Sequence, residues 1–298
     1  MKVLVTGSTG LVGSALVSFL TAGGHQVVRL VRRQPAPGAA EVRWEPAAGT
    51  VDTAGLEGLD AVVHLAGETI TGRWTPARKA RMRDSRVKGT RLLADSLARL
   101  ARPPKVLVCA SAIGYYGNRG LEVLREDSGP GTGFLPEVCR AWEAASQPAA
   151  QKGIRVVHLR IGVVLSEAGG ALKQMLLPFK LGMGGRLGSG QQYMSWIAMD
   201  DLVGVIQHSL TTESLRGAVN AVAPRAVTNL EFTKTLGRVL GLPTIFPLPG
   251  FMVRLAFGEL ADALLLASAR VEPARLAASG FRFQHPELEA ALRHLLGK

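Results

Sequence analysis

The sequence predicts an α/β fold built around a doubly wound parallel sheet. Short apolar runs alternate with amphipathic helical segments over the first half of the 298 residues. These runs lack polar alternation, which is typical of strands buried on both faces of a parallel sheet. With 47% apolar and 19% charged residues, the chain has enough apolar side chains for a large core and no signature of disorder.

The predicted elements follow one another in βαβ order. The first strand is "KVLVTG", followed by a helix over 11–22 and the strand "QVVRLV". After a short strand "EVRWEP" and a buried strand "DAVVHLAG", a long helix is expected over about 76–100. The strand "KVLVCAS", a helix over about 135–151 and the strand "RVVHLRIGVVL" complete the series.

The pattern becomes irregular after Gly169, where "GMGGRLGSGQQYMSWI" predicts a loop or hairpin. We therefore divide the chain into a Rossmann-type domain over 1–168 and a smaller, partly discontinuous lobe over 169–298. Segments near 195–225 are expected to return to the first domain, and a distinct C-terminal segment covers about 247–296.

A glycine-rich turn joins the first strand to the first helix. The segment "TGSTGLVG" places Gly7, Gly10 and Gly13 at the spacing G-x-x-G-x-x-G. The glycines permit a tight turn and close approach to a pyrophosphate, and the helix N-terminus supplies N–H donors. The sequence therefore predicts a dinucleotide site formed by Thr6, Gly7, Thr9, Gly10, Leu11, Val12 and Gly13.

The second strand ends at Arg32 and Arg33, about twenty residues beyond the glycines. A carboxylate at this place would accept a hydrogen bond from the ribose 2′-hydroxyl of NAD, whereas guanidinium groups match a 2′-phosphate. We therefore expect NADP(H) to be preferred over NAD(H). Ordinary surface charge is the alternative, and it applies to Arg33 more than to Arg32.

The strand "DAVVHLAG" is expected to bring further residues to the cofactor. Those at its end are Leu65, Ala66, Gly67 and Glu68. Asp60 stands before this strand, and its carboxylate either meets the adenine edge or bonds at the start of the strand. His64 sits inside the apolar run and is expected to belong to the core.

Bulk composition excludes several classes of function. The net charge is +12, but the arginines are dispersed without interleaved aromatic residues, so nucleic-acid binding is not expected. No apolar run approaches the ~20 residues of a membrane span. Cys109 and Cys139 form no disulfide framework or metal motif, and no metal is expected. With no signal peptide at Met1, we expect a cytoplasmic monomer or homodimer.

Motifs along the chain match those of a known superfamily. They are the glycine motif, "HLAG" at 64–67, "YYG" at 115–117, "LRIGVVL" at 159–165 and "WIAMDDL" at 196–202. Through them the chain resembles the extended, epimerase/dehydratase branch of the short-chain dehydrogenase/reductases.

A tighter resemblance rests on "LAGETITGRWTPARKARMRDSRVKGTRLL", "SAIGYYG" and "CRAWEAA". These segments are similar to an atypical epimerase-like subfamily often labelled cell-division-inhibitor-like. The tail "FGELADALLLASARVEPARLAASGFRF" resembles the C-terminal domain of unknown function of that subfamily.

The resemblance implies a catalytic Tyr-x-x-x-Lys pair that this chain lacks. In the superfamily the Tyr exchanges a proton with the substrate oxygen, the Lys lowers its pKa and holds the nicotinamide ribose, and a Ser or Thr orients the oxygen. Alignment of "GFLPEVCRAWEAAS" on its Trp-Glu pair puts Leu135 and Cys139 at the Tyr and Lys positions. Alignment of "YYG" puts Ala112 at the position of the superfamily's Ser or Thr. Glu143 shares a helix face with Leu135 and Cys139, and a structural role is expected for it.

Other residues around the site must then supply the proton donor. Tyr115 and Tyr116 follow the strand "KVLVCAS", and one is expected to point into the site and the other into packing. Ser111 can hydrogen-bond a substrate oxygen. These three are the candidate catalytic residues.

The substrate side is expected to include Arg73, Trp74, Lys79 and Trp196. Arg73 and Lys79 suit an anionic substrate or the cofactor phosphates, or else form a solvated helix face. The two tryptophans either line a pocket or pack between the lobes. Arg160 ends a strand and is assigned to the cofactor site, with a structural ion pair as the alternative.

Two functions fit these residues. One is an NADP(H)-dependent oxidoreductase or epimerase-like enzyme acting on an unknown small carbonyl or hydroxyl substrate. The other is a non-catalytic NADP(H)-binding regulator or partner-binding protein, favoured by the loss at Ala112, Leu135 and Cys139. Nucleotide-sugar epimerisation in the usual manner ranks below both because it requires the missing Tyr.

Overall fold

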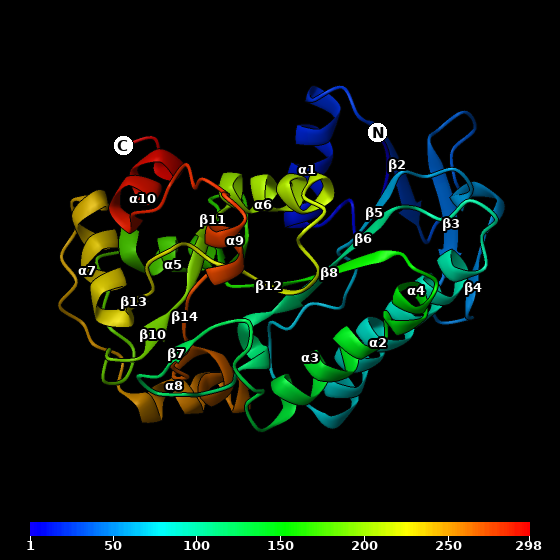
Figure 1. The fold of residues 1–298 in the computed structure, drawn as a ribbon. Helices are drawn as coiled ribbons and strands as arrows, with labels where there is room; N and C mark the ends of the chain where they lie inside the picture. The colour runs from blue at the N-terminus through cyan, green and yellow to red at the C-terminus, as the bar shows by residue number, and fades with distance from the viewer.

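An eight-stranded sheet forms the centre of the structure, a computed structural model that describes residues 1–298. In spatial order the strands are β12 (Gly217–Ala221), β8 (Arg155–Ile161), β6 (Val106–Ala112), β5 (Ala61–His64), β1 (Lys2–Thr6), β2 (Gln26–Val31), β3 (Glu41–Glu45) and β4 (Thr50–Val51). All neighbours are parallel except β3 and β4. The order reverses at β1, so the predicted doubly wound fold is confirmed (Figure 1).

Helices cover both faces of this sheet. One face carries α1 (Leu11–Ala22) and α6 (Met199–Thr211), and the other carries α2 (Pro76–Ala98), α3 (Phe134–Ala144) and α4 (Gln147–Gln151). The alternation of strand side chains decides the partner: Val3 and Val5 face α1, whereas Leu4 faces α2.

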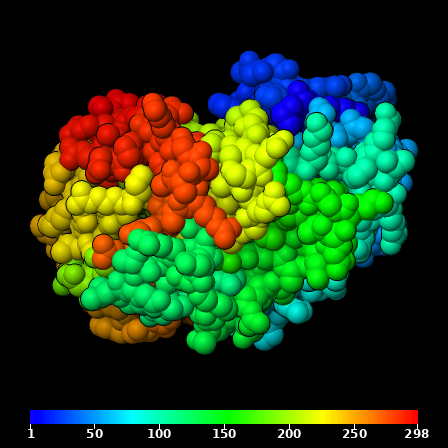
Figure 2. All heavy atoms as spheres, viewed as in Figure 1, coloured from blue at the N-terminus to red at the C-terminus, as the bar shows by residue number.

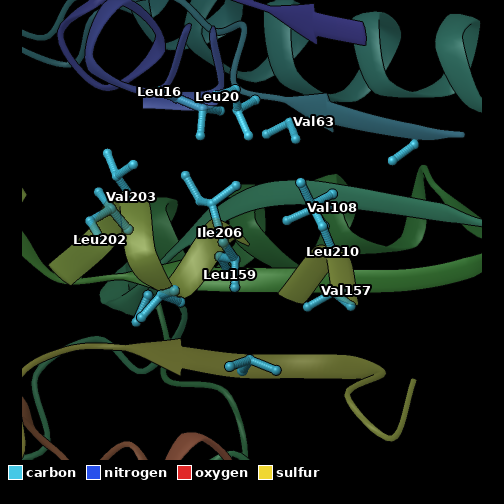
Figure 3. Close-up of a cluster of buried hydrophobic side chains, with 14 of the residues drawn as sticks. Leu16, Leu20, Val63, Val108, Val157, Leu159, Leu202, Val203, Ile206 and Leu210 are labelled. Carbon is cyan, nitrogen blue, oxygen red and sulfur yellow. The ribbon is translucent and has the colours of Figure 1, made fainter. Parts of the chain in front are cut away.

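Each face of the sheet has an apolar core beneath its helices, and the larger core lies between the sheet and helices α1 and α6 (Figure 3). Figure 3 labels Leu16, Leu20, Val63, Val108, Val157, Leu159, Leu202, Val203, Ile206 and Leu210 in this core. Both α6 and β12 come from the segment near 195–225, which therefore packs with the first part of the chain. Leu276 of α9 (Ala274–Ala278) belongs to the same core, so the C-terminal tail contacts both lobes.

The second lobe is built around its own apolar cluster. It contains β9 (Val163–Leu165), α5 (Gly170–Lys180), β11 (Trp196–Ala198), α7 (Asn229–Leu240) and α10 (Leu288–Leu296). Smaller elements are β7 (Val123–Leu124), β10 (Tyr193–Met194), β13 (Val227–Thr228), α8 (Gly250–Phe257) and β14 (Arg270–Val271). Figure 2 shows the C-terminal residues gathered on one side of the molecule and the N-terminal residues on the other.

Two predicted elements are interrupted. The helix expected over 135–151 is split into α3 and α4, because Pro148 has no N–H and its ring would clash with the preceding turn of a continuous helix. The strand "RVVHLRIGVVL" breaks at Gly162, where a Cβ would lie 2.6 Å from the carbonyl oxygen of Ser195. After this close approach, β9 leaves the main sheet and pairs with β11.

None of the helices is both long and apolar enough to span a membrane.

Candidate functional site

The glycine loop lies at the carboxyl edge of the sheet, where the strand order reverses. Gly7 has a φ of +64°, in the left-handed region that glycine adopts without strain. A Cβ on Gly13 would lie 2.1 Å from the carbonyl oxygen of Gly7, and one on Gly7 would lie 2.9 Å from the carbonyl carbon of Leu65. The amides of the first turn of α1 have no partner within the helix. This bare, donor-rich cradle fits a dinucleotide pyrophosphate.

A buried hydrogen-bond chain holds the loop after β5 beside this cradle. Thr6 Oγ1 accepts from the amides of Leu65 and Ala66, both at 3.0 Å. Its own proton therefore goes to His64 Nδ1, 2.8 Å away, and His64 Nε2 donates to Thr90 Oγ1 at 3.0 Å. Burial lowers the pKa of His64 to about 4, so its ring is neutral. Thr6 and His64 thus position the loop from below, and His64 is a core residue as expected.

The other predicted cofactor residues of this edge are accessible to different extents. Thr9, Gly10 and Gly67 are exposed, and Leu11, Val12, Leu65, Ala66 and Glu68 are half-buried. The exposed Arg32 makes no side-chain hydrogen bond. By contrast, Arg33 contacts Glu41 at 2.5 Å and donates to the carbonyl oxygen of Gln34 at 3.0 Å. Arg32 is therefore the guanidinium free to bind an anion.

Asp60 lies at the opposite edge of the sheet. It precedes β5, and its Oδ2 accepts a hydrogen bond from the backbone N–H of Lys2 at 2.6 Å. In a parallel sheet the amino ends of the strands face away from the carboxyl edge. Asp60 therefore bonds at the start of the strand, and its assignment to the cofactor site is wrong.

A buried ion pair occupies the position where Arg160 was expected to meet the cofactor. Arg160 Nε and Nη2 donate to the two carboxylate oxygens of Glu143, at 2.9 and 3.0 Å. Ser111 Oγ donates to the same carboxylate at 2.7 Å. Burial alone lowers the pKa of Arg160, but the bonds to Glu143 raise it above its usual value. Arg160 and Ser111 are thus committed to a structural network, and the cofactor assignment of Arg160 is wrong.

The two tyrosines after β6 differ sharply in environment. Tyr116 is completely buried, and its hydroxyl lies 2.7 Å from Asn220 Oδ1 and accepts from Arg160 Nη1 at 3.0 Å. Tyr115 is half-buried, its ring centroid lies 3.4 Å from Arg160 Cζ, and its hydroxyl makes no hydrogen bond within the chain. Tyr116 therefore packs, and Tyr115 alone of the pair has an available hydroxyl.

The face of α3 that turns toward β6 offers no acid–base group at the usual positions. Cys139 Sγ lies 3.8 Å from the carbonyl oxygen of Ala112, and burial raises the pKa of this thiol to about 12. Leu135 packs in an apolar cluster with Trp74 and Leu260. A thiol that stays protonated and a leucine provide no proton-transfer group here.

Most of the predicted substrate-side residues are structural. Trp74 is buried, and its Nε1 donates to a carbonyl oxygen at 2.8 Å. Trp196 is completely buried in the second lobe, so it walls no pocket. Lys79 pairs with Glu259 at 2.7 Å and so connects α2 to the C-terminal lobe. Arg73 is exposed and makes no ion pair.

Sequence reasoning gave no role to Arg86, which the structure places at the site. The guanidinium lies under the loop after β5: a Cβ on Gly67 would be 3.4 Å from Arg86 Cζ. It also lies 5.0 Å from the ring centroid of Trp142 and donates to the carbonyl oxygen of Met82 at 3.0 Å. Burial lowers its pKa, and the negative charge of the nearby Glu68 acts in the opposite direction. No carboxylate pairs with this half-buried cation.

The fold and the glycine cradle together define a Rossmann-type nucleotide-binding protein. Residues 3–221 match the NAD dependent epimerase/dehydratase family, and residues 248–295 match a domain of unknown function. The chain belongs to the NAD dependent epimerase/dehydratase family, an extended branch of the short-chain dehydrogenase/reductases.

Relatives match over nearly the whole chain. An epimerase family protein of Mycobacterium bovis is 46% identical over 97% of this chain and 96% of its own. The human epimerase family protein SDR39U1 is 40% identical over 99% of this chain and 100% of its own. The crystal structure of human SDR39U1 isoform 2 with NADPH superposes with a TM-score of 0.92 at 37% identity, covering 100% of both chains.

The variant Glu143→Ala is expected to destabilise the fold by about 3–5 kcal/mol, because it leaves the Arg160 guanidinium buried without a counter-charge. Urea unfolding followed by circular dichroism measures the loss. Glu122→Ala, which breaks an exposed pair with Arg119, is the matched control and should cost less than about 1 kcal/mol. Equal losses in the two variants would contradict the structural role of the buried pair.

Stability should fall as pH decreases below 6.5, because unfolded His64 takes up a proton that the folded ring refuses down to about pH 4. His64→Asn removes this group and keeps a neutral hydrogen-bonding side chain. Unfolding free energies measured at several pH values should show that the wild type loses about 3 kcal/mol more than the variant across this window. Parallel pH profiles for the two proteins would refute the assignment.

Proposed function

We propose that the chain is an NADP(H)-dependent oxidoreductase or epimerase-like enzyme that acts on a small carbonyl or hydroxyl substrate without a Tyr-x-x-x-Lys pair. The observation that carries the proposal is the free hydroxyl of Tyr115. It follows β6 at the same edge of the sheet as the glycine cradle. A half-buried phenol without an internal partner at this edge is available to a substrate oxygen.

Several residues of the chain suit NADP(H). The cradle from Gly7 to Gly13 would receive the pyrophosphate, and Arg32 at the end of β2 would meet the 2′-phosphate with charge-assisted hydrogen bonds. The human relative was solved with NADPH, which supports the same choice of cofactor here. When bound, NADP(H) would supply or accept the hydride.

The chain's own contribution to the reaction is proton transfer and orientation. Tyr115 would donate a proton to a carbonyl oxygen in reduction, or accept one from a hydroxyl in oxidation. Its ring stacks on the Arg160 guanidinium, which is itself fixed by Glu143. This stacking holds the phenol in one orientation and places a positive charge beside it, which favours the phenolate that proton donation leaves behind.

Arg86 would take over the role of the missing lysine. It projects from α2 toward Cys139, the position that the lysine vacates, and it reaches the underside of Gly67. A cation there without a carboxylate partner suits the hydroxyls of the nicotinamide ribose. The positive charge would thus come from α2 instead of α3 but would act at the same nicotinamide ribose.

A second candidate function is cofactor binding without catalysis. Its supporting observations are the buried thiol of Cys139 and the commitment of Ser111 and Tyr116 to structural hydrogen bonds. A protein of this kind would report the NADP(H) state to a partner. In the first candidate Tyr115 moves a proton, and in the second it does not.

Cofactor binding tests Arg32 and Arg86 separately. NADPH should bind the wild type at least about tenfold more tightly than NADH, and Arg32→Gln should remove this preference. Arg86→Gln should weaken NADPH binding about tenfold but leave the affinity for adenosine 2′,5′-bisphosphate, which lacks the nicotinamide ribose, unchanged.

Titration calorimetry measures these affinities, and Arg216→Gln, an exposed arginine at the amino edge of the sheet, is the matched control. An equal loss for both ligands in Arg86→Gln would show that Arg86 only supports the fold. An unchanged preference in Arg32→Gln would exclude it as the 2′-phosphate ligand.

Turnover tests Tyr115. With NADPH and a panel of aldehydes, ketones and keto sugars, Tyr115→Phe should lower kcat by about 10²–10⁴-fold while leaving NADPH affinity unchanged, because only the proton donor is lost. NADPH oxidation is followed by absorbance. Tyr116→Phe is the comparison, because it removes a buried hydroxyl and should act mainly on stability. Strong NADPH binding without turnover of any carbonyl would favour the non-catalytic candidate.

A further inference from the structure

A cluster of metal-competent side chains joins helix α6 to the C-terminal helix α10. It consists of Asp200 in the first turn of α6, His285 in the segment before α10, and His294 within α10. One ligand atom from each residue lies within 4.8 Å of the other two. The two imidazole rings stack with centroids 4.2 Å apart. The Nε2 atoms of both rings lie near the Asp200 carboxylate.

The spacing of these atoms suits a small divalent cation. Metal–ligand distances of about 2.0–2.1 Å at tetrahedral angles separate neighbouring ligand atoms by about 3.3 Å. Asp200 Oδ2 lies 2.8 Å from His294 Nε2 and 3.9 Å from His285 Nε2, values on either side of that separation. An imidazole nitrogen binds a metal in the plane of its ring, so the two stacked rings must also turn toward one another for both to bind one ion.

The backbone around the cluster is already fixed. The buried Asp201 carboxylate accepts from the backbone amides of Gln284 at 2.6 Å and His285 at 3.0 Å. His294 is held because Leu288 and Leu292, on the same helix, are buried in the core of the second lobe. A cation would therefore meet ligands whose backbone positions are already set.

Access to the cluster is open. The side chains of Asp200 and His294 are 48% and 51% exposed, and that of His285 is 16% exposed. The neighbouring Arg293 is paired with Glu289, which moderates its repulsion of a cation. A bound metal would keep at least one water molecule in its remaining coordination position.

We propose that Asp200, His285 and His294 form a binding site for one divalent transition-metal ion. Two imidazoles and one carboxylate favour Zn²⁺, and they disfavour Mg²⁺ and Ca²⁺, which prefer oxygen ligands. Asp200 and His294 are 94 positions apart in the chain, so the metal cross-links α6 to the C-terminal tail. Because the unfolded chain offers no such set of ligands, zinc stabilises the folded state. This inference is independent of the proposed redox function.

The test uses the full chain without an affinity tag, freed of metal by chelation. Calorimetric titration with Zn²⁺ should give one site per chain, and saturating zinc should raise the midpoint of thermal unfolding by about 5 °C. Asp200→Asn, His285→Ala and His294→Ala should each lose the zinc-dependent shift. The comparison is made with and without zinc in the same protein, since His294→Ala also removes a hydrogen bond from the metal-free fold.

His25→Ala, which removes an imidazole outside the cluster, is the matched control and should retain the shift. Co²⁺ provides a second readout, because visible absorption bands of a four- or five-coordinate site should appear in the wild type and disappear in the three cluster variants. The proposal is overturned if the wild type shows no saturable zinc binding, or if the three variants keep the zinc-dependent shift.

Discussion

The buried ion pair between Arg160 and Glu143 is the interaction on which the candidate site depends. Removing two charges from water is unfavourable, and good geometry with further hydrogen bonds must offset that cost. Here both carboxylate oxygens are engaged, Ser111 adds a bond, and Tyr116 accepts from the guanidinium. The pair thereby joins β8, α3 and the end of β6, and through Asn220 it also reaches β12. This network helps to fix α3 against the sheet, together with the buried apolar side chains of the helix.

The fixed orientation of α3 has consequences for the chemistry that the site can support. Leu135 and Cys139 lie on the side of α3 that faces the end of β6, and neither supplies an acid or a base there. The groups that we propose for the chemistry come from other elements: Tyr115 follows β6, and Arg86 projects from α2. Family membership establishes the fold here but not the activity.

Contacts between the two parts of the chain are distributed over several points. Trp74 and Leu135 pack with Leu260, and Lys79 pairs with Glu259 beside them. On another side, Asp201 holds the backbone before α10, next to the His285 and His294 cluster. The C-terminal domain is thus fixed both near the predicted substrate side and along α6. Movement of this lobe relative to the sheet would require several of these contacts to break.

The sequence by itself determined the sheet and the glycine cradle, because these depend on local periodicity and fixed spacing. It anticipated that only one of Tyr115 and Tyr116 would be free, but not which. Burial decided that Tyr116 packs and that Arg160 pairs with Glu143. The direction of β5 in the parallel sheet placed Asp60 at the amino edge, away from the cofactor. The approach of Arg86 to Gly67 and the meeting of Asp200 with His294 were also decided by tertiary structure. Such contacts join segments far apart in the chain, and only the packing of the helices on the sheet sets their distances.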